Sequence, residues 1–311
     1  MVGNFIDNIR FDLKKIPSNW NSGARLTKTD YGNIRVLDTG GNKPVIINTP
    51  DGPNVIEHHL KLIKELSKNF RIICFELPGI GFSYPNFKYD YSLTKASKLI
   101  INLMDILKVP RATLAFSCSN GFYAIKTAEL YPDRVNKLFL SQTPSLHAMD
   151  EWVKKSIPNI LKYPLIGQVS NSFSEKKFAK MWYRYALPKG TDVSEYQNIA
   201  LNSLNTGGCF CLSGLVQGLK KDLNTSLKLL EVPSTLIWGN MDYTHKKTNN
   251  ESILEHIPNC EIIEFGNCGH FPELEETNKY VKLINERFRQ PNTTTTQRKC
   301  ILERIVFKIL P

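Results

Sequence analysis

The sequence lacks any long hydrophobic run. Its first 20 residues contain no apolar stretch of signal-peptide length, and no segment approaches the roughly 20 apolar residues needed to cross a bilayer. We therefore expect a cytoplasmic protein. The chain has 311 residues, of which 41% are hydrophobic and 22% are charged, so it can bury a full core and is expected to be globular.

The patterns of a disulfide framework, a metal site and a nucleotide-binding loop are also missing. The seven cysteines are irregularly spaced and odd in number, so most should be free thiols. Cys209, Cys211 and the pair at 58–59 have no further ligands at metal spacing. Gly79 and Gly81 are not followed by the third glycine of a dinucleotide fingerprint. No metal and no cofactor are therefore expected.

Concentrated positive charge is absent from most of the chain, although the formal net charge is +11. Lysines and arginines are spread along the sequence, which favours a solvated basic surface over a nucleic-acid site. The exception is 291–311, where a linker rich in Pro and Thr precedes a basic amphipathic tail. We expect this tail to dock on the domain itself, with a partner or weak contact with an anionic membrane as alternatives. Its apolar face is formed by Ile301, Leu302, Ile305, Val306, Ile309 and Leu310.

Short β-branched runs alternate with helical patterns along the rest of the chain. The runs at 24–30 and 33–39 predict an antiparallel hairpin. Crossover helices are expected at 58–69, 92–108 and 120–132. The sequence thus predicts an α/β fold with a mostly parallel eight-stranded sheet and helices on both faces. The parallel strands are expected at 44–49, 70–77, 112–117, 135–142, 234–240 and 260–265.

The segment 144–233 does not follow this alternation and predicts an inserted helical cap. Helices are expected within it near 149–156, 174–186, 194–204 and 209–221. Its aromatic residues are interpreted mainly as cap core, with some of them lining an apolar pocket. The expected organisation is an N-terminal segment at 1–22, a core formed by 23–143 and 234–290, the cap at 144–233, and the linker and tail at 291–311.

A tight strand-to-helix break is the most informative local feature. The strand at 112–117 breaks at Ser117–Gly121 and turns directly into a helix. A side chain there stands above the sheet, where the helix dipole and free N–H groups stabilise an anion. A thiol so placed is expected to have a lowered pKa. Ser117, Cys118 and Ser119 compete for the position, and the small flanking residues by themselves would favour Ser119.

Here the sequence resembles the α/β-hydrolase superfamily. The family's nucleophile elbow reads R-A-x-L-V-G-x-S-x-G-G and is followed by a helix ending in Y-P-x-R-V. The matches at 111–112 on one side and 131–135 on the other both place Cys118 in the nucleophile position. The chain departs from the family at Phe116 and Asn120, which stand where glycines are usual, so local repacking is expected. The resemblance covers about 23–288.

The resemblance also implies an acid and a histidine, in the order nucleophile, acid, histidine. The segment 238–242 matches W-G-x-x-D, which makes Asp242 the acid that orients the histidine. The segment 269–275 matches G-H-x-x-x-x-E, which makes His270 the base. A turn-capping aspartate and a loop histidine are the alternatives, but their joint occurrence after successive strands favours a triad. The loop at 76–83 resembles D-x-P-G-x-G-x-S and is expected to form a tight turn near the site.

The oxyanion hole departs further from the family pattern. The resemblance implies that the Ser119 N–H is one donor and that a His-Gly loop after the third strand supplies the other. This chain instead has Asn-Thr-Pro-Asp-Gly-Pro at 48–53. Pro50 has no N–H, so Thr49 or Asp51 must provide the second donor.

Together these residues predict a hydrolase or acyltransferase that acts on an ester or thioester through an acyl-Cys118 intermediate. A sulfur nucleophile favours exchange with thiol carriers, so a thioesterase or acyltransferase is preferred to a plain carboxylesterase. The expected partner is a small acyl substrate, free or carried as a thioester. The alternative is a non-catalytic α/β-hydrolase scaffold that binds a small apolar ligand or a protein, motivated by the missing His-Gly loop. Enzymes with a carboxylate nucleophile are excluded, because 117–119 offers none.

Overall fold

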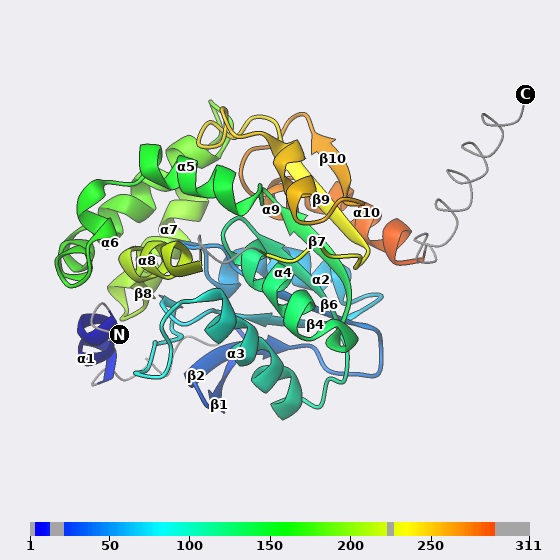
Figure 1. The fold of residues 1–311 in the computed structure, drawn as a ribbon, viewed down its shortest axis with the longest axis horizontal. Coiled ribbons are helices and arrows are strands. Elements are labelled where there is room, and N and C mark those ends of the chain that lie inside the picture. Colours follow the sequence, from blue (N-terminus) through cyan, green and yellow to red (C-terminus); the bar gives the residue numbers. More distant parts are fainter. Residues whose placement is uncertain (1–3, 13–21, 223–226, 290–311) are drawn as a thin grey trace, which may run out of the picture.

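The computed structural model describes residues 4–12, 22–222 and 227–289. One sheet of eight strands runs through it in the order β1-β2-β4-β3-β6-β7-β9-β10 (Figure 1). β1 and β2 form the predicted antiparallel hairpin, β2 also pairs antiparallel with β4, and the remaining pairs are parallel. The predicted sheet is confirmed, with strands β1 Arg25–Thr29, β2 Gly32–Asp38, β3 Val45–Thr49, β4 Arg71–Phe75, β6 Ala112–Ser117, β7 Val135–Ser141, β9 Ser234–Gly239 and β10 Glu261–Phe265.

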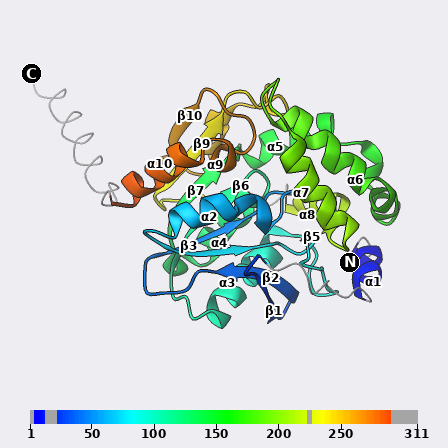
Figure 2. The ribbon, with the colours of Figure 1, turned by 180° about the vertical axis from the view of Figure 1, so that it is seen from behind.

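Helices cover both faces of the sheet, as expected. α3 (Leu93–Ile106) and α4 (Asn120–Leu130) lie on the face seen in Figure 1. α2 (Leu60–Leu66), α9 (Pro272–Glu275) and α10 (Thr277–Arg289) lie on the other face, seen in Figure 2. β6 and β9 are buried at every position, because a parallel strand covered on both faces has no side exposed to water. Short 3-10 turns occur at η1 Ile56–His59, η2 Pro132–Arg134 and η4 Asn250–Glu255.

Among the described residues between β7 and β9, four helices and a 3-10 turn lie over one end of the sheet (Figure 1). The fourth helix begins at Leu212, later than the expected start at 209, because the preceding residues form a strand. Cys209–Phe210 form the short strand β8, which pairs antiparallel with β5 (Ile80–Gly81). The glycine-containing loop at 76–83 thereby holds the cap to the core. The cap elements are α5 Leu146–Ser156, η3 Asn159–Lys162, α6 Ile166–Ala186, α7 Ser194–Asn205 and α8 Leu212–Asp222.

An N-terminal helix, α1 (Asn4–Asp12), was not predicted from the sequence. It packs on α6, where Arg10 Nη2 lies 2.6 Å from Glu175 Oε1. No helix among the described ranges is long and apolar enough to cross a membrane. The expected amphipathic tail falls outside the described residues.

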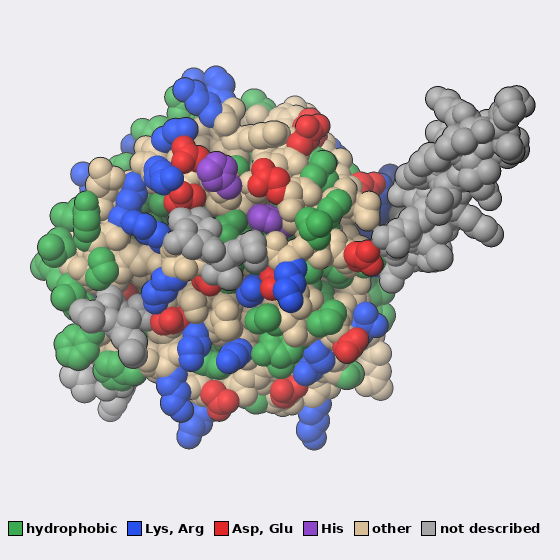
Figure 3. All heavy atoms as spheres, viewed as in Figure 1, with side chains coloured by type: hydrophobic (Ala, Val, Ile, Leu, Met, Phe, Trp, Pro, Cys, Tyr) green, Lys and Arg blue, Asp and Glu red, His purple; other side chains and the backbone are tan. Residues whose placement is uncertain are grey.

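The surface carries interspersed charges and one apolar row. On the face that Figure 3 shows, Lys and Arg side chains alternate with acidic ones instead of forming a single basic patch. Hydrophobic side chains gather at its left margin, over α6. That helix exposes Ile166, Val169 and Phe173, whose spacing of three and four residues places them on one side.

Candidate active site

The strand-to-helix break holds Cys118 in a left-handed backbone conformation. Its φ is 51°, between the end of β6 and the start of α4. A non-glycine residue in this region costs on the order of 1–3 kcal/mol and persists only where its surroundings fix it. Here the Cys118 N–H donates to Ser141 O at 2.7 Å, and the Thr143 hydroxyl donates to Cys118 O at 3.0 Å. The end of β7 therefore clamps the turn.

The two residues that replace the usual glycines beside the elbow are both accommodated. Phe116 is buried and packs edge-on against Phe75, with ring centroids 6.1 Å apart. Asn120 is the first residue of α4, and its side-chain Nδ2 donates to Pro50 O at 3.0 Å. Asn120 thus ties the elbow to the loop after β3. The expected repacking takes the form of an aromatic contact on one side and a cross-link between two loops on the other.

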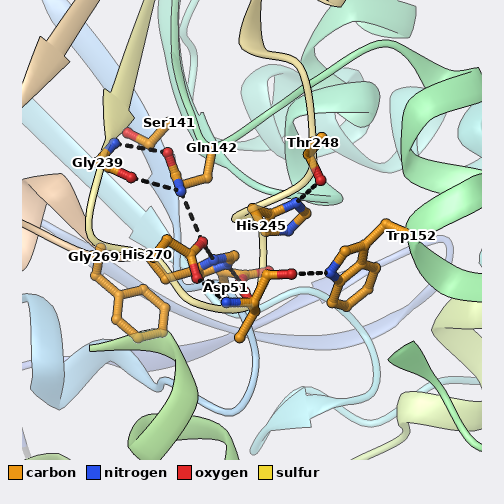
Figure 4. Close-up of polar contacts among 12 residues, drawn as sticks. Asp51, Ser141, Gln142, Trp152, Gly239, His245, Thr248, Gly269 and His270 are labelled. Atoms are coloured by element: carbon orange, nitrogen blue, oxygen red, sulfur yellow. Dashed lines mark hydrogen bonds and ion pairs between the residues drawn. The ribbon is translucent and has the colours of Figure 1, made fainter. Parts of the chain in front are cut away.

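His270 and Asp242 meet as the resemblance implied. His270 Nδ1 lies 2.6 Å from Asp242 Oδ2, and both side chains are buried. Asp242 Oδ1 accepts hydrogen bonds from the Thr244 N–H and hydroxyl, at 2.8 and 2.6 Å. Gln142 Nε2 donates to Asp242 Oδ2 at 2.8 Å, and Gly239 N–H donates to Gln142 Oε1 (Figure 4). Sequence reasoning missed Gln142, because no motif or spacing connects it to the acid.

The acidic residue of the G-H-x-x-x-x-E pattern positions the histidine without touching its ring. Glu275 accepts hydrogen bonds from the Gly269 and Phe271 N–H groups, at 2.7 and 2.9 Å. His270 N–H donates to Ala186 O at the end of α6. A Cβ at Gly269 would collide with that same carbonyl, so only glycine permits this approach of the histidine loop to the cap.

Cys118 faces this histidine from the elbow. Its Sγ and ring nitrogens of His245 and His270 lie within 4.8 Å of one another. Ser117, an alternative nucleophile, is turned elsewhere, since its hydroxyl donates to Glu273 Oε1 at 2.7 Å. Ser119 lines the cavity beside Cys118. The structure therefore brings Cys118, His270 and Asp242 together.

The loop after β3 contributes a carboxylate that sequence reasoning did not foresee. Asp51 Oδ2 lies 3.2 Å from His270 Nε2, the nitrogen that would face a nucleophile. Asp51 and Ser119 both line the cavity, whereas Thr49 is the last residue of β3 and is not among the lining residues. Of the three predicted oxyanion-hole residues, Ser119 and Asp51 thus reach the cavity and Thr49 does not.

The charges of this cluster determine its protonation. Burial disfavours the imidazolium of His270, but Asp242, Cys118 and the hydrogen bond to Asp51 outweigh it and hold the His270 pKa well above its usual value. Asp242 is buried too, yet the charge and hydrogen bond of His270 keep its pKa well below the usual range. Burial raises the pKa of Asp51, against the opposing effect of His270.

The expected lowering of the thiol pKa is wrong. Burial and the charge of Asp51 raise the pKa of Cys118 to about 11, although His270 and the Ser119 N–H act in the opposite direction. The helix N-terminus behind Cys118 favours the thiolate, but desolvation of a buried sulfur is the larger effect. With Asp51 ionised, Cys118 is a thiol at neutral pH.

A cavity of about 360 Å³ opens above Cys118 between the sheet and the cap. Its lining is mostly apolar and includes Met149, Ile157, Phe178, Leu215 and Leu219 from the cap helices. Trp182 of the cap stands edge-on to His270, with ring centroids 5.1 Å apart. Trp152 donates its indole N–H to Thr244 O at 2.7 Å and stacks on His245 (Figure 4). Cap aromatics therefore roof the site as well as filling the cap core.

The comparisons with known proteins agree with this architecture. The family model for the alpha/beta hydrolase fold matches residues 50–277. Human monoacylglycerol lipase ABHD6 is 22% identical over 268 residues, which cover 83% of this chain and 79% of that enzyme. A 2-hydroxy-6-oxononadienedioate/2-hydroxy-6-oxononatrienedioate hydrolase from Burkholderia vietnamiensis is 22% identical over 267 residues, covering 83% of this chain and 91% of the other.

Solved structures with the same fold include epoxide hydrolase A from Mycobacterium thermoresistibile, with a TM-score of 0.70 and 14% identity over 84% of this chain and 96% of that one. The enol-lactonase from Burkholderia xenovorans has a TM-score of 0.65 and 16% identity over 86% of this chain and 100% of that one. At these identities the likeness concerns the fold, while the family match spans most of the chain. The protein therefore belongs to the α/β-hydrolase fold family and is an enzyme of the α/β-hydrolase type.

Proposed function

We propose that this enzyme cleaves or transfers an apolar acyl group of an ester or thioester through an acyl-Cys118 intermediate. The observation that carries the proposal is the strained elbow, which holds Cys118 beside His270 and Asp242 at the base of an apolar cavity. Similar proteins include a lipase that acts on monoacylglycerols, which fits an acyl substrate with an aliphatic chain. A cavity of about 360 Å³ lies in the range typical of small-ligand sites.

The reaction begins with removal of the Cys118 proton. His270, flanked by Asp242 and Asp51, accepts this proton in its neutral form, which its raised pKa makes the less populated one. The thiolate attacks the acyl carbonyl, the S–C bond forms, and the carbonyl electrons move to oxygen. Collapse of this intermediate expels the alcohol or thiol of the substrate, which takes a proton from His270. Water or another acceptor then attacks the thioester, and Cys118 regains its proton.

The oxyanion is held by backbone N–H groups in this proposal. The Ser119 N–H favours the Cys118 thiolate, which supports its role as the first donor. The Asp51 N–H is the second donor, since this residue lines the same cavity as Cys118 and Ser119. An ionised Asp51 side chain would repel the oxyanion, so proton uptake by the pair of His270 and Asp51 also removes that repulsion.

Acyl trapping tests the mechanism directly. The enzyme is mixed with p-nitrophenyl esters and acyl thioesters of increasing chain length, and its intact mass is followed during turnover. We expect an added mass equal to one acyl group, located on the peptide that contains Cys118. Cys118→Ala should abolish both turnover and adduct, whereas Cys260→Ala, which alters another buried thiol, should retain both.

Sustained turnover by Cys118→Ala, with no adduct in the wild type, would show that cysteine is not the nucleophile. The ratio of ester to thioester turnover then distinguishes an esterase from a thioesterase or acyltransferase. A thiol acceptor added to the assay identifies acyl transfer by formation of the exchanged thioester.

A further inference from the structure

A second histidine stands at the nucleophile without a part in the proposed reaction. His245 lies on the loop after β9, and its ring is stacked on that of His270 with centroids 5.3 Å apart. Cys118 Sγ, one nitrogen of His245 and one nitrogen of His270 all lie within 4.8 Å of one another. All three side chains are buried, and they come from three loops at the same edge of the sheet. Sequence reasoning missed this group, because Cys118 lies more than a hundred residues before both histidines and the two histidines lie on different loops.

His245 is prepared for a ligand. Its Nδ1 lies 3.1 Å from the Thr248 hydroxyl, and its Nε2 has no hydrogen-bond partner among the described residues, although the side chain is 2% exposed. An unsatisfied buried nitrogen is destabilising, and a bound ligand would satisfy it.

The ring of His270 is also oriented for ligand binding. Its Nδ1 is held by Asp242 at 2.6 Å, which leaves Nε2 facing Asp51. A carboxylate on the far nitrogen is the usual support of a metal-binding histidine. Asp51 Oδ2 lies 3.2 Å from Nε2 but outside the group of three mutually close ligand atoms, so it becomes a fourth ligand only if its side chain moves.

We propose that this cluster binds a thiophilic divalent cation, zinc in particular, through Cys118, His245 and His270, with Asp51 or water in the fourth position. One thiolate and two imidazoles favour zinc over magnesium or calcium, which prefer oxygen ligands. In a tetrahedral zinc site such atoms are about 3.3–3.6 Å apart, so the side chains need to close by only about 1 Å. Binding displaces the Cys118 thiol proton, and any proton on His270 Nε2, to solvent.

Bound zinc would occupy the nucleophile and its base together. Acyl chemistry and metal binding are therefore mutually exclusive, and zinc acts as a reversible inhibitor that a chelator removes. The inference goes beyond the proposed function, because it requires the positions of three ligand atoms and no turnover.

Cobalt(II) provides a readout independent of activity. The full-length protein is freed of metal with a chelator, which is then removed, and is titrated with cobalt(II) while the near-ultraviolet thiolate-to-cobalt charge-transfer band is recorded. We expect one band that saturates at one equivalent and disappears on addition of zinc. His245→Gln should weaken cobalt binding at least tenfold, whereas His147→Gln, which alters an exposed histidine on α5, should not. Cys118→Ala should lose the band, and Cys260→Ala should keep it.

Absence of the band in the wild type, or equal cobalt affinity in His245→Gln, would overturn the metal site. Thermal unfolding shows whether His245→Gln is folded, and His245→Asn provides a second variant if it is not. Turnover in the presence of chelator is measured separately. A protein that turns over but gives no band retains the proposed function and lacks the metal site. A protein that gives the band but does not turn over has the metal site and lacks the proposed function.

Discussion

Replacing Asp51 by asparagine removes a carboxylate that lies 3.2 Å from His270 and raises the pKa of Cys118. Burial and Asp51 together raise the Cys118 pKa from 9.0 to about 11, a disadvantage for the thiolate of about 2.7 kcal/mol. Burial is the larger cause and remains in the variant, so we expect the Cys118 pKa to fall by about one unit, equivalent to about 1.4 kcal/mol. The thiolate fraction near neutral pH should then rise about tenfold.

Asp51→Asn should also lower the pKa of His270. His270 loses one of the carboxylates that raise its pKa, so a larger fraction is neutral and available as a base. Its Nε2 also loses the carboxylate acceptor at 3.2 Å and becomes available to the Cys118 thiol. Because a less protonated His270 lowers the Cys118 pKa less, the expected fall in that pKa comes from the loss of the Asp51 charge itself.

Alkylation by iodoacetamide, followed by mass spectrometry of the Cys118 peptide between about pH 6 and pH 10, measures this shift. Asp51→Asn should move the Cys118 profile to lower pH, and Asp51→Glu, which keeps the charge, should resemble the wild type. The Cys260 peptide in the same sample is an internal reference. A Cys118 profile that does not move, or that moves to higher pH in Asp51→Asn, would refute the assignment of the raised pKa to Asp51.

Three further substitutions probe other parts of the site. Gly121→Ala would bring a Cβ into the Thr143 side chain and should cost about 1–3 kcal/mol in chemical unfolding, and an unchanged midpoint would rule out this close approach. The Asp242 pKa lies below its ordinary 3.8, so its ionised form stabilises the fold above that pH and the benefit is lost as pH falls further. Urea unfolding should therefore give a stability difference between wild type and Asp242→Asn that shrinks below about pH 4, and a constant difference would contradict the lowered pKa. Phe178→Ala should shift the preferred acyl chain to longer lengths in the ester screen, because Phe178 lines the cavity. An unchanged chain-length preference would show that Phe178 does not limit the chain.

The fold was predictable because its signals are local. Each strand is a short β-branched run, and each triad candidate directly follows one of these runs, where parallel strands bring their carboxyl ends together. The same rule predicts from the sequence that Cys118, Asp242 and His270 lie at one edge of the sheet. The Cys209–Phe210 strand escaped prediction because it depends on pairing with a segment far away in the sequence. Ile80 pairs with Phe210, 130 residues later in the chain, and Gly81 pairs with Cys209.

The electrostatics of the site were less accessible from sequence. The helix behind Cys118 is visible in the residue pattern and predicts a lowered thiol pKa, but the opposing burial and the Asp51 charge arise only when the chain folds. Gln142 and His245 were missed for a related reason, since ordinary loop residues acquire their roles from neighbours on other loops. In contrast, Glu275 carries a motif position, and its contacts with two backbone N–H groups explain why that position is acidic.

The hydrogen bond from Asn120 to Pro50 connects the elbow with the loop after β3, although the two residues are 70 positions apart in the chain. A glycine at 120 would restore the family's elbow pattern, but it would also release the loop that carries Asp51. A His-Gly pair in that loop would in turn change the segment that Asn120 holds. Substitutions at the two places therefore depend on each other, and a return to the common family sequence requires changes in both loops.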